Sequence, residues 1–446
     1  MTTVQIAPRT LSERILQPFQ RFFQIEASGG VLLLICAATA LAWANSPWAA
    51  SYTSIWQMKL TVGLGSFVLS KSLLLWINDG LMAVFFFVVG LEIKREVLAG
   101  ELASLKRAAL PIAAALGGML APALFYTAFN AGRPGAAGWG IPMATDIAFA
   151  LGMLALLGNR VPVSLKVFLT ALAIVDDIGA VLVIAVFYST DIAWLSLLVA
   201  AGFLILLIAL NVAGVRHPLP YALIGIGLWV AFLKSGVHAT IAGVLLAMTI
   251  PSRARINEPE FLANGRSLLD EFERATGNEI DRLITEEQLA VVEALETVCE
   301  QIETPLQRLE HALHGWVMYA IMPIFALANA GVALGEDLLA ALTHLVTFGV
   351  IAGLLFGKTL GISVFTWLAV RSGVAALPEG VGWRQIVGAG MLGGIGFTMS
   401  LFIADLAFVD TPLLTPAKLG IMIASLIAGV AGWLVLRNTG GAAAKA

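Results

Sequence analysis

The chain has 446 residues, of which 59% are hydrophobic and 12% are charged, and its mean hydropathy is +0.90. This composition excludes an ordinary soluble domain and predicts an all-α polytopic membrane protein, because only helices and closed barrels satisfy backbone polar groups in lipid. The net charge of −3 excludes nothing, and the two cysteines, Cys36 and Cys299, form no disulfide or zinc pattern.

Residues 1–27 are basic and weakly amphipathic, and no small-residue cleavage site follows the first apolar run. They therefore do not read as a cleavable signal peptide. We expect a cytoplasmic N-terminal segment.

Apolar runs between turn signals predict twelve transmembrane helices, eight within 28–250 and four within 315–437. Their expected bounds are 28–45, 73–93, 108–129, 139–159, 164–188, 192–212, 220–234, 236–250, 315–335, 344–370, 384–409 and 416–436.

The segment between the first two predicted helices alternates polar and apolar residues around a glycine turn. Its sequence is SIWQMKLTVGLGSFVLSKS. This pattern is more typical of a strand pair than of a helix, so we expect an external hairpin at about 55–70.

Two predicted spans are interrupted. Residues 134–148 place Pro142 and three glycines before Asp146, and residues 388–400 contain five glycines within nine positions. Each is the middle of a three-span group, and the two groups, 108–188 and 344–436, enter the membrane from opposite sides. Matched interruptions of this kind are typical of inverted-repeat transporters with a site at mid-membrane. The alternative is that these glycines only allow close helix packing.

Residues 251–314 form an acidic insert, and its 252–310 portion holds 14 acids against six arginines. Apolar residues recur at helical spacing, with a break at 276–277 and a new start at Thr304-Pro305. We expect two or three amphipathic cytoplasmic helices.

The distribution of basic residues predicts the orientation. With the N-terminus in the cytoplasm, the cytoplasmic loops and tails hold 20 of the 26 Lys and Arg residues. Without the six arginines of the insert, 14 still lie on that side against four on the other. The positive-inside rule therefore predicts a cytoplasmic N-terminus and a cytoplasmic tail at 438–446.

Few charges lie within the predicted spans. They are Asp79, Asp146, Asp176, Asp177, Lys358 and Asp405. A charge at the bilayer centre costs about 2.5–3.5 kcal/mol on insertion scales, so each needs a reason.

Asp176 and Asp177 are adjacent and therefore about 100° apart around a helix. One can face a water-filled cavity while the other turns to a basic partner. Lys358 is the lysine deep in a span of the other three-span group, so an Asp176–Lys358 pair would leave Asp177 as the exposed ligand. The alternative is a purely stabilising ion pair, but buried pairs stabilise poorly and this leaves Asp177 unexplained.

The other acids near the spans have more open interpretations. Asp146 follows Thr145 where the interrupted span resumes, so its carboxylate would offset the partial positive charge of helix N-termini. Asp79 is either functional or a polar packing contact. Glu92 lies where a span meets a basic loop, and a solvated helix end would explain it equally well.

Carboxylate oxygens suit Na⁺, a hard cation. Burial raises the pKa of carboxyl groups in general, so one site can hold either a proton or a metal ion. That competition would allow ion exchange.

Six stretches carry a family resemblance. They are WINDGLMAVFFFVVGLEIKRE, IPMATDIAFALGMLALLG, ALAIVDDIGA, LKSGVHATIAGV, GLLFGKTLGIS and GGIGFTMSLFIA. Over about residues 25–437, apart from the insert, the chain closely resembles the NhaA-type sodium/proton antiporters of bacterial inner membranes, themselves an example of inverted-repeat transporters.

The resemblance implies twelve helices with two crossed, unwound helices near 139–146 and 390–397. It implies electrogenic exchange of cytoplasmic Na⁺ or Li⁺ for external H⁺, serving sodium and pH homeostasis, with no cofactor and no nucleic-acid partner. Asp176 and Asp177 would carry the ions, Asp146 and Thr145 would lie near the crossing, and Lys358 would pair with Asp176. A homodimer would form through the external hairpin.

The resemblance also assigns a pH response to Glu92, His238, Glu310, His311 and His314. From the residues alone, His311 and His314 are as well explained by an ordinary solvated helix face, and His238 by a structural role. Histidine titrates near neutral pH, so a sensor is chemically reasonable.

Three features depart from the family pattern. The insert is much longer than expected, and Gln307-Arg308 stands where a basic pair is expected before Glu310. Both affect the pH set point rather than the transport chemistry. Asp405 is an acid where a small polar residue is expected, either as a packing contact or as a residue that tunes the site.

Two rival functions are weighed against antiport. An intramembrane aspartyl protease needs aspartates on separate helices that meet at one peptide bond, which the adjacent pair does not supply. A passive cation channel needs a ring of carbonyls or acids from several subunits.

Overall fold

The computed structural model describes residues 11–64, 67–189, 191–275, 285–335, 338–409 and 411–439. The predicted break at 276–277, residues 1–10 of the N-terminal segment and residues 440–446 of the tail lie outside the described residues.

The first half of the chain is helical apart from one pair of strands. Its elements are α1 (Leu11–Ala44), α2 (Ala49–Gln57), β1 (Lys59–Leu64), β2 (Phe67–Ser72), α3 (Leu73–Leu75), the π-helix η1 (Trp76–Leu81), α4 (Met82–Ala99), η2 (Glu101–Ala103), α5 (Leu105–Asn130), the 3₁₀ helix η3 (Pro134–Met143), α6 (Ile147–Ala155), η4 (Gly158–Arg160), α7 (Val163–Phe187), α8 (Trp194–Val212), α9 (Pro218–Leu233) and α10 (Ile241–Thr249).

The second half contains the insert and the last helices of the bundle. Its elements are α11 (Glu258–Ala275), α12 (Glu286–Ile302), α13 (Pro305–Trp316), the π-helix η5 (Val317–Ile321), α14 (Met322–Asn329), α15 (Leu338–Leu342), α16 (Leu345–Ala352), the π-helix η6 (Gly353–Gly357), α17 (Lys358–Arg371), α18 (Trp383–Gly393), α19 (Phe397–Ala407) and α20 (Leu414–Thr439).

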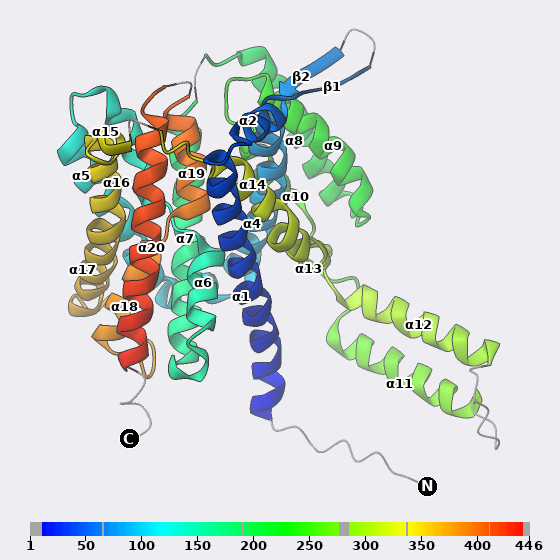
Figure 1. The fold of residues 1–446 in the computed structure, drawn as a ribbon. Helices are drawn as coiled ribbons and strands as arrows, with labels where there is room; N and C mark the ends of the chain where they lie inside the picture. The colour runs from blue at the N-terminus through cyan, green and yellow to red at the C-terminus, as the bar shows by residue number, and fades with distance from the viewer. Residues whose placement is uncertain are drawn as a thin grey trace.

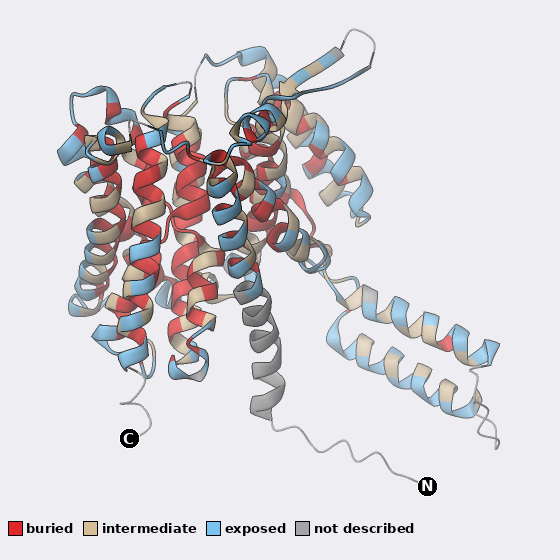
Figure 2. Cartoon of the chain, in the orientation of Figure 1, coloured by how far each residue is buried: buried red, intermediate tan, exposed pale blue. Residues whose placement is uncertain are grey.

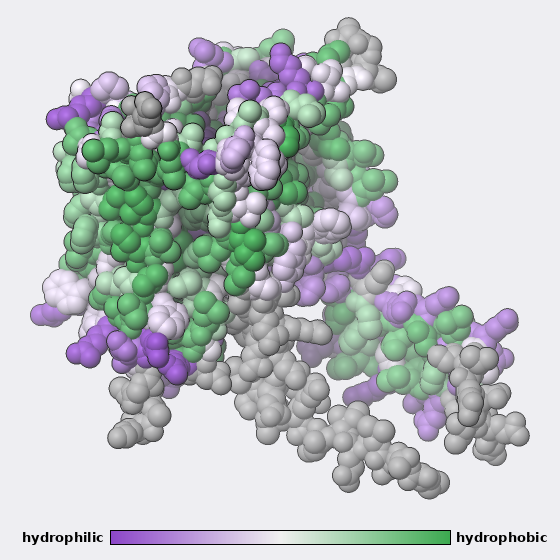
Figure 3. Space-filling model, in the orientation of Figure 1, coloured by the Kyte–Doolittle hydropathy of each residue, from purple (hydrophilic) through white to green (hydrophobic). Residues whose placement is uncertain are grey.

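Helices run side by side in one bundle, with two appendages at opposite ends (Figure 1). The β1–β2 hairpin projects from one end, which we call the hairpin end, and α11 and α12 project from the other, the insert end. On the face shown in Figure 3, apolar side chains form a band between polar ends, and buried residues fill the interior of the bundle (Figure 2). This is the distribution expected of a protein whose outer surface contacts lipid.

Among the described residues, seven helices are long and apolar enough to cross a membrane, and up to ten cross it if each bent pair counts as one span. The chain is therefore a polytopic helical membrane protein, as predicted. Two predicted spans correspond to α9 and α10, which have 16 and 9 residues. The count of twelve stays a prediction.

The hairpin starts later than predicted. Residues Ala49–Gln57 form α2, and the antiparallel strands pair from Lys59↔Ser72 to Leu64↔Phe67. Tyr52 and Trp56 are four residues apart on the buried face of α2, where Tyr52 also stacks edge-on against Trp43. This helical pattern of aromatic burial outweighs the alternation that suggested a strand.

Both interrupted spans are bent. The helices η3 and α6 meet at 41°, and α18 and α19 meet at 45°. The family resemblance implies an unwound segment near 139–146; in the structure residues 134–143 form a 3₁₀ helix, and residues 144–146 are non-helical. Pro142, next to the last residue of η3, has no backbone N–H and therefore cannot donate a helical hydrogen bond, which favours the end of the helix at Met143.

The insert is a pair of helices whose base is closed. The Arg255 N–H donates to the Gln301 carbonyl at 2.9 Å, and the Leu306 N–H donates to the Pro251 carbonyl at 3.2 Å. A capping box at Thr304 and Gln307 then starts α13. The chain thus leaves and re-enters the bundle at adjacent points.

Candidate ion-binding site

The centre of the bundle holds three charged side chains from two helices. Asp176 and Asp177 lie on α7 with 1% exposure each, and Lys358 opens α17 with 0% exposure. Lys358 Nζ donates to Asp176 Oδ2 at 2.6 Å. This is the pairing expected from the sequence, and the helical turn between the two acids directs Asp177 elsewhere.

Lys358 follows directly on the π-helix Gly353–Gly357. An extra residue in a helical turn shifts the direction of the side chains that follow it, and such bulges often occur at functional sites. Gly117 on α5 and Gly361 on α17 are in backbone contact, which brings these two helices close together one turn beyond Lys358.

The two breaks are in contact with each other. The Asp146 N–H donates to the Ile395 carbonyl at 2.7 Å, and Thr145 Oγ1 donates to the Gly393 carbonyl at 2.8 Å. Each break therefore satisfies polar groups of the other in a region where water is scarce.

The Asp146 carboxylate caps both resumed helices. Its Oδ1 accepts the N–H of Phe149 in α6 at 3.0 Å, and its Oδ2 accepts both the N–H of Thr398 in α19, at 3.1 Å, and the Thr398 hydroxyl. One negative charge thus serves two helix N-termini, whose partial charges are positive.

One cavity is lined both by these acids and by groups that lie nearer the insert end. Asp177 and Asp146 line it together with Glu92, His314 and a set of apolar side chains. Within the described residues, no group donates a hydrogen bond to Asp177 Oδ2 or to Asp176 Oδ1, although both atoms are buried. Carboxylate oxygens that accept no hydrogen bond and lie in or beside a cavity can bind an alkali cation or a proton.

Charged groups gather where the cavity approaches the insert end. His314 Nδ1 lies 3.7 Å from a Glu92 oxygen, and Arg95 Nε lies 3.3 Å from a Glu310 oxygen. These contacts tie α13 to α4. His311, one turn before His314 on α13, is exposed.

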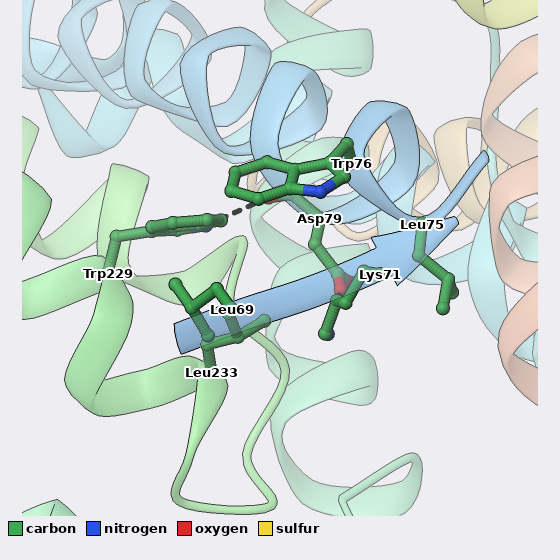
Figure 4. Close-up of a pocket in the computed structure, with 7 residues that line it drawn as sticks. All are labelled: Leu69, Lys71, Leu75, Trp76, Asp79, Trp229 and Leu233. Atoms are coloured by element: carbon green, nitrogen blue, oxygen red, sulfur yellow. Dashed lines mark hydrogen bonds and ion pairs between the residues drawn. The ribbon is translucent and has the colours of Figure 1, made fainter. Parts of the chain in front are cut away.

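His238 lies apart from that group, at the hairpin end. Its Nε2 is 3.8 Å from Asp79, and Asp79 accepts a 2.7 Å hydrogen bond from Lys71. Figure 4 shows this pair beside Trp76 and Trp229, and the Trp229 ring N–H donates to the Asp79 carbonyl. The residues expected to respond to pH thus occupy two separate places, and Asp79 does not meet the central acids.

Asp405 is also paired at the hairpin end. Lys418 Nζ lies 2.9 Å from its Oδ1, and the Asn78 amide lies 3.4 Å from its Oδ2.

Sequence reasoning missed three partners. Thr398 lies in the motif GGIGFTMSLFIA, Arg95 lies in WINDGLMAVFFFVVGLEIKRE, and Lys418 lies at the start of the last predicted span. A sequence shows that such polar groups enter the membrane but not which acid each one faces.

Nearly all of the chain matches one family of transporters. The sequence model for "Na+/H+ antiporter 1" matches residues 20–436. Similar proteins include a Na(+)/H(+) antiporter NhaA of Oleidesulfovibrio alaskensis, 53% identical with 97% of this chain and 96% of the relative covered. Another is an NhaA 2 of Syntrophotalea carbinolica, 54% identical over 94% and 96%. An NhaA of Koribacter versatilis is 53% identical over 95% and 92%. A match of this extent shows that the chain belongs to the Na⁺/H⁺ antiporter family and is a membrane transporter, not an enzyme.

Proposed function

We propose that the chain carries out the Na⁺/H⁺ exchange for which its family is named, with Asp177 and Asp176 as the ion-carrying groups. The observation that carries this proposal is the buried Asp177 oxygen without a donor among the described residues, on the wall of a cavity that leads to Glu92. A carboxylate in that position is neutralised by a proton or by Na⁺, and the two ions compete for the same oxygens.

Besides a proton and Na⁺, the Lys358 ammonium can also neutralise the charge of Asp176. When Asp176 is ionised and holds no cation, the ammonium 2.6 Å away balances its charge. When a proton or Na⁺ binds Asp176, Lys358 must be displaced. If both acids cycle, two protons are exchanged per sodium ion and one net positive charge moves inward with each turnover.

The proposed fold for this cycle has twelve spans in an inverted repeat, with the two breaks crossing at mid-membrane. The hydrogen bonds that Thr145 and Asp146 donate to the carbonyls of Gly393 and Ile395 support it. The insert end faces the cytoplasm and the hairpin end faces outward, because most Lys and Arg residues lie toward the insert end. The proposed location is a bacterial inner membrane, and the proposed assembly is a homodimer joined by the hairpins.

The test is proton flux in everted membrane vesicles after addition of Na⁺, Li⁺ or K⁺ over a range of pH. Asp177→Asn is expected to abolish the Na⁺-dependent signal, because an amide cannot exchange a proton for a cation. The control is Asp191→Asn, an exposed acid whose positive φ of 49° asparagine tolerates, and its flux stays normal. A Na⁺-dependent signal that survives in Asp177→Asn defeats the proposal, and peptide cleavage or flux indifferent to a proton gradient would favour the rival functions.

A further inference from the structure

Three helices carry the same sequence of layers from the cavity toward the hairpin end. On α19 the order is Met399, Phe402, Asp405, and on α14 it is Met322, Phe325, Asn329. Residues three or four apart share one helix face and rise by about 4.5–6 Å along it. Both methionines line the cavity, so the phenylalanines and polar residues follow beyond its end.

The chain η1–α4 runs in the opposite direction and shows the same layers. Val89 lines the cavity, Phe86 lies three residues nearer the hairpin end beside Phe85, which also reaches the cavity, and Asn78 lies farther toward the hairpin end. Because η1–α4 runs antiparallel to α14 and α19, its apolar, aromatic and polar residues lie at the same depths in the bundle as theirs.

The middle layer is a closed aromatic plug. Phe402 lies between Phe86, with ring centroids 5.7 Å apart, and Phe325, with centroids 6.2 Å apart. All three rings are at most 1% exposed. The edge of His238 also packs on Phe402, with centroids 5.2 Å apart. An ion in the cavity cannot pass toward the hairpin end unless these rings separate.

The outer layer is a polar cluster that joins four elements. Asn329 and Asn78 exchange amide hydrogen bonds at 2.9 and 3.3 Å. Lys418 at the start of α20 donates to Asp405 and, at 3.0 Å, to the Asn329 carbonyl. Lys418 thus fastens α14 to α19, and Asn78 fastens η1 to both.

This cluster is distinct from the ion-binding site, because it lies on the other side of the aromatic plug. Its charged pair is shielded, with side-chain exposures of 14% for Asp405 and 12% for Lys418. A shielded pair costs desolvation in the closed state and is easily replaced by hydration once water enters. Such a pair holds a closed arrangement without making opening prohibitive.

We propose that Asp405 and Lys418, supported by Asn78 and Asn329, latch an external gate whose barrier is the plug of Phe86, Phe325 and Phe402. The latch is closed in this structure, where the cavity at Asp177 lies on the same side of the plug as Glu92 and His314. Opening of the latch would let ions pass between the central acids and the hairpin end. The direction of transport rests on the proposed function, but the latch and plug are argued from packing alone.

The experiment measures access to the cavity rather than transport. The chain's own cysteines are removed as Cys36→Ser and Cys299→Ser, and Met399→Cys is introduced as a reporter beneath the plug. Right-side-out vesicles in sodium-free buffer are treated with a cationic, membrane-impermeant methanethiosulfonate, and the rate of modification is followed. Asp405→Asn and Lys418→Met are each expected to speed modification at least about fivefold, the lower range of ordinary coupling between sites.

Two further variants decide the interpretation. The charge exchange Asp405→Lys with Lys418→Asp restores a pair and is expected to return the rate to that of the reporter background. Lys71→Met breaks the Lys71–Asp79 pair at the hairpin end, which touches the plug only through His238, and is expected to leave the rate unchanged. The proposal is overturned if Asp405→Asn and Lys418→Met label no faster than background, or if Lys71→Met accelerates labelling equally. Because no sodium is present, either result is independent of whether Na⁺ is the transported ion.

Discussion

At the scale of single residues, the buried charges are best understood by their partners. Asp176 has an ammonium, Asp146 has three donors, and Asp177 has a cavity. The same side-chain type therefore occupies three electrostatic environments within one site. The most exchangeable of the three is the acid with the fewest fixed donors, which is Asp177.

The Asp176–Lys358 pair gives the first prediction. Lys358→Met leaves a buried carboxylate without its counter-charge, which costs about 3–5 kcal/mol of stability. Adding Asp176→Asn removes that charge and should recover a large part of the loss. Thermal unfolding in detergent measures both variants. Equal melting temperatures for Lys358→Met and the unmodified protein would contradict the prediction.

The second prediction concerns Thr398. Thr398→Val removes the hydroxyl that donates to Asp146 and keeps the side-chain shape, so the loss of a hydrogen bond to a charged group should cost about 1.5–3 kcal/mol. Thr398→Ser keeps the hydroxyl and should retain most of the stability. The comparison is again thermal unfolding, and a serine variant as unstable as the valine variant would argue that packing matters more than the hydrogen bond.

At the scale of elements, helix contacts position the site. The contact between α5 and α17 depends on Gly117 and Gly361, since a Cβ added to either would meet the backbone of the other helix. Small residues at such contacts are typical of membrane helices. Lys358 lies one turn before this contact, so helix spacing and the position of the ammonium are coupled.

The third prediction concerns this contact. Gly361→Ala should destabilise the protein by about 1–3 kcal/mol, the usual cost of overpacking. Gly202→Ala on α8 is the matched control, because nothing lies within 4 Å of its added Cβ. That variant should be neutral or slightly stabilising. If both variants unfold at the same temperature, the close approach of α5 and α17 is not needed for stability.

The fourth prediction concerns the insert. Its base is closed by the bonds at Arg255 and Leu306, so residues 256–300 can be replaced by a short Gly-Ser turn without moving α13. The deletion removes twelve acids and three arginines from the end near Glu92 and His314. Less negative charge disfavours proton binding nearby, so transport should persist with its pH dependence moved to lower pH. Proton flux in everted vesicles measures this, and an unchanged profile would show that the insert does not set the pH response.

At the scale of the whole molecule, the hairpin offers the clearest surface for self-association. Leu60 and Val62 are 47% and 53% exposed on one face of the hairpin, and Val68 is 55% exposed on the other face. Both strands also have a free edge, which can pair with a second hairpin.

The fifth prediction follows from that surface. Val62→Lys with Val68→Lys should convert a dimer to a monomer, because opposed charges of like sign would face an identical hairpin. Ala131→Lys adds charge at the same end but off the hairpin, and should leave the dimer intact. Light scattering of the detergent-solubilised protein measures the mass. A dimer that persists in the double variant would place the interface elsewhere.

The sequence by itself determined the class of protein, the two interrupted spans and the acids that enter the membrane. These features are local, because burying a charge or breaking a helix in lipid is costly wherever it occurs, and family motifs mark them further. Only the tertiary structure decided which groups meet. That Thr398 bonds Asp146, that His238 lies far from His314, and that Lys418 fastens Asp405 depend on contacts between helices distant in the chain. Helical periodicity shows which residues share a face, but it carries no information on which helix that face will meet.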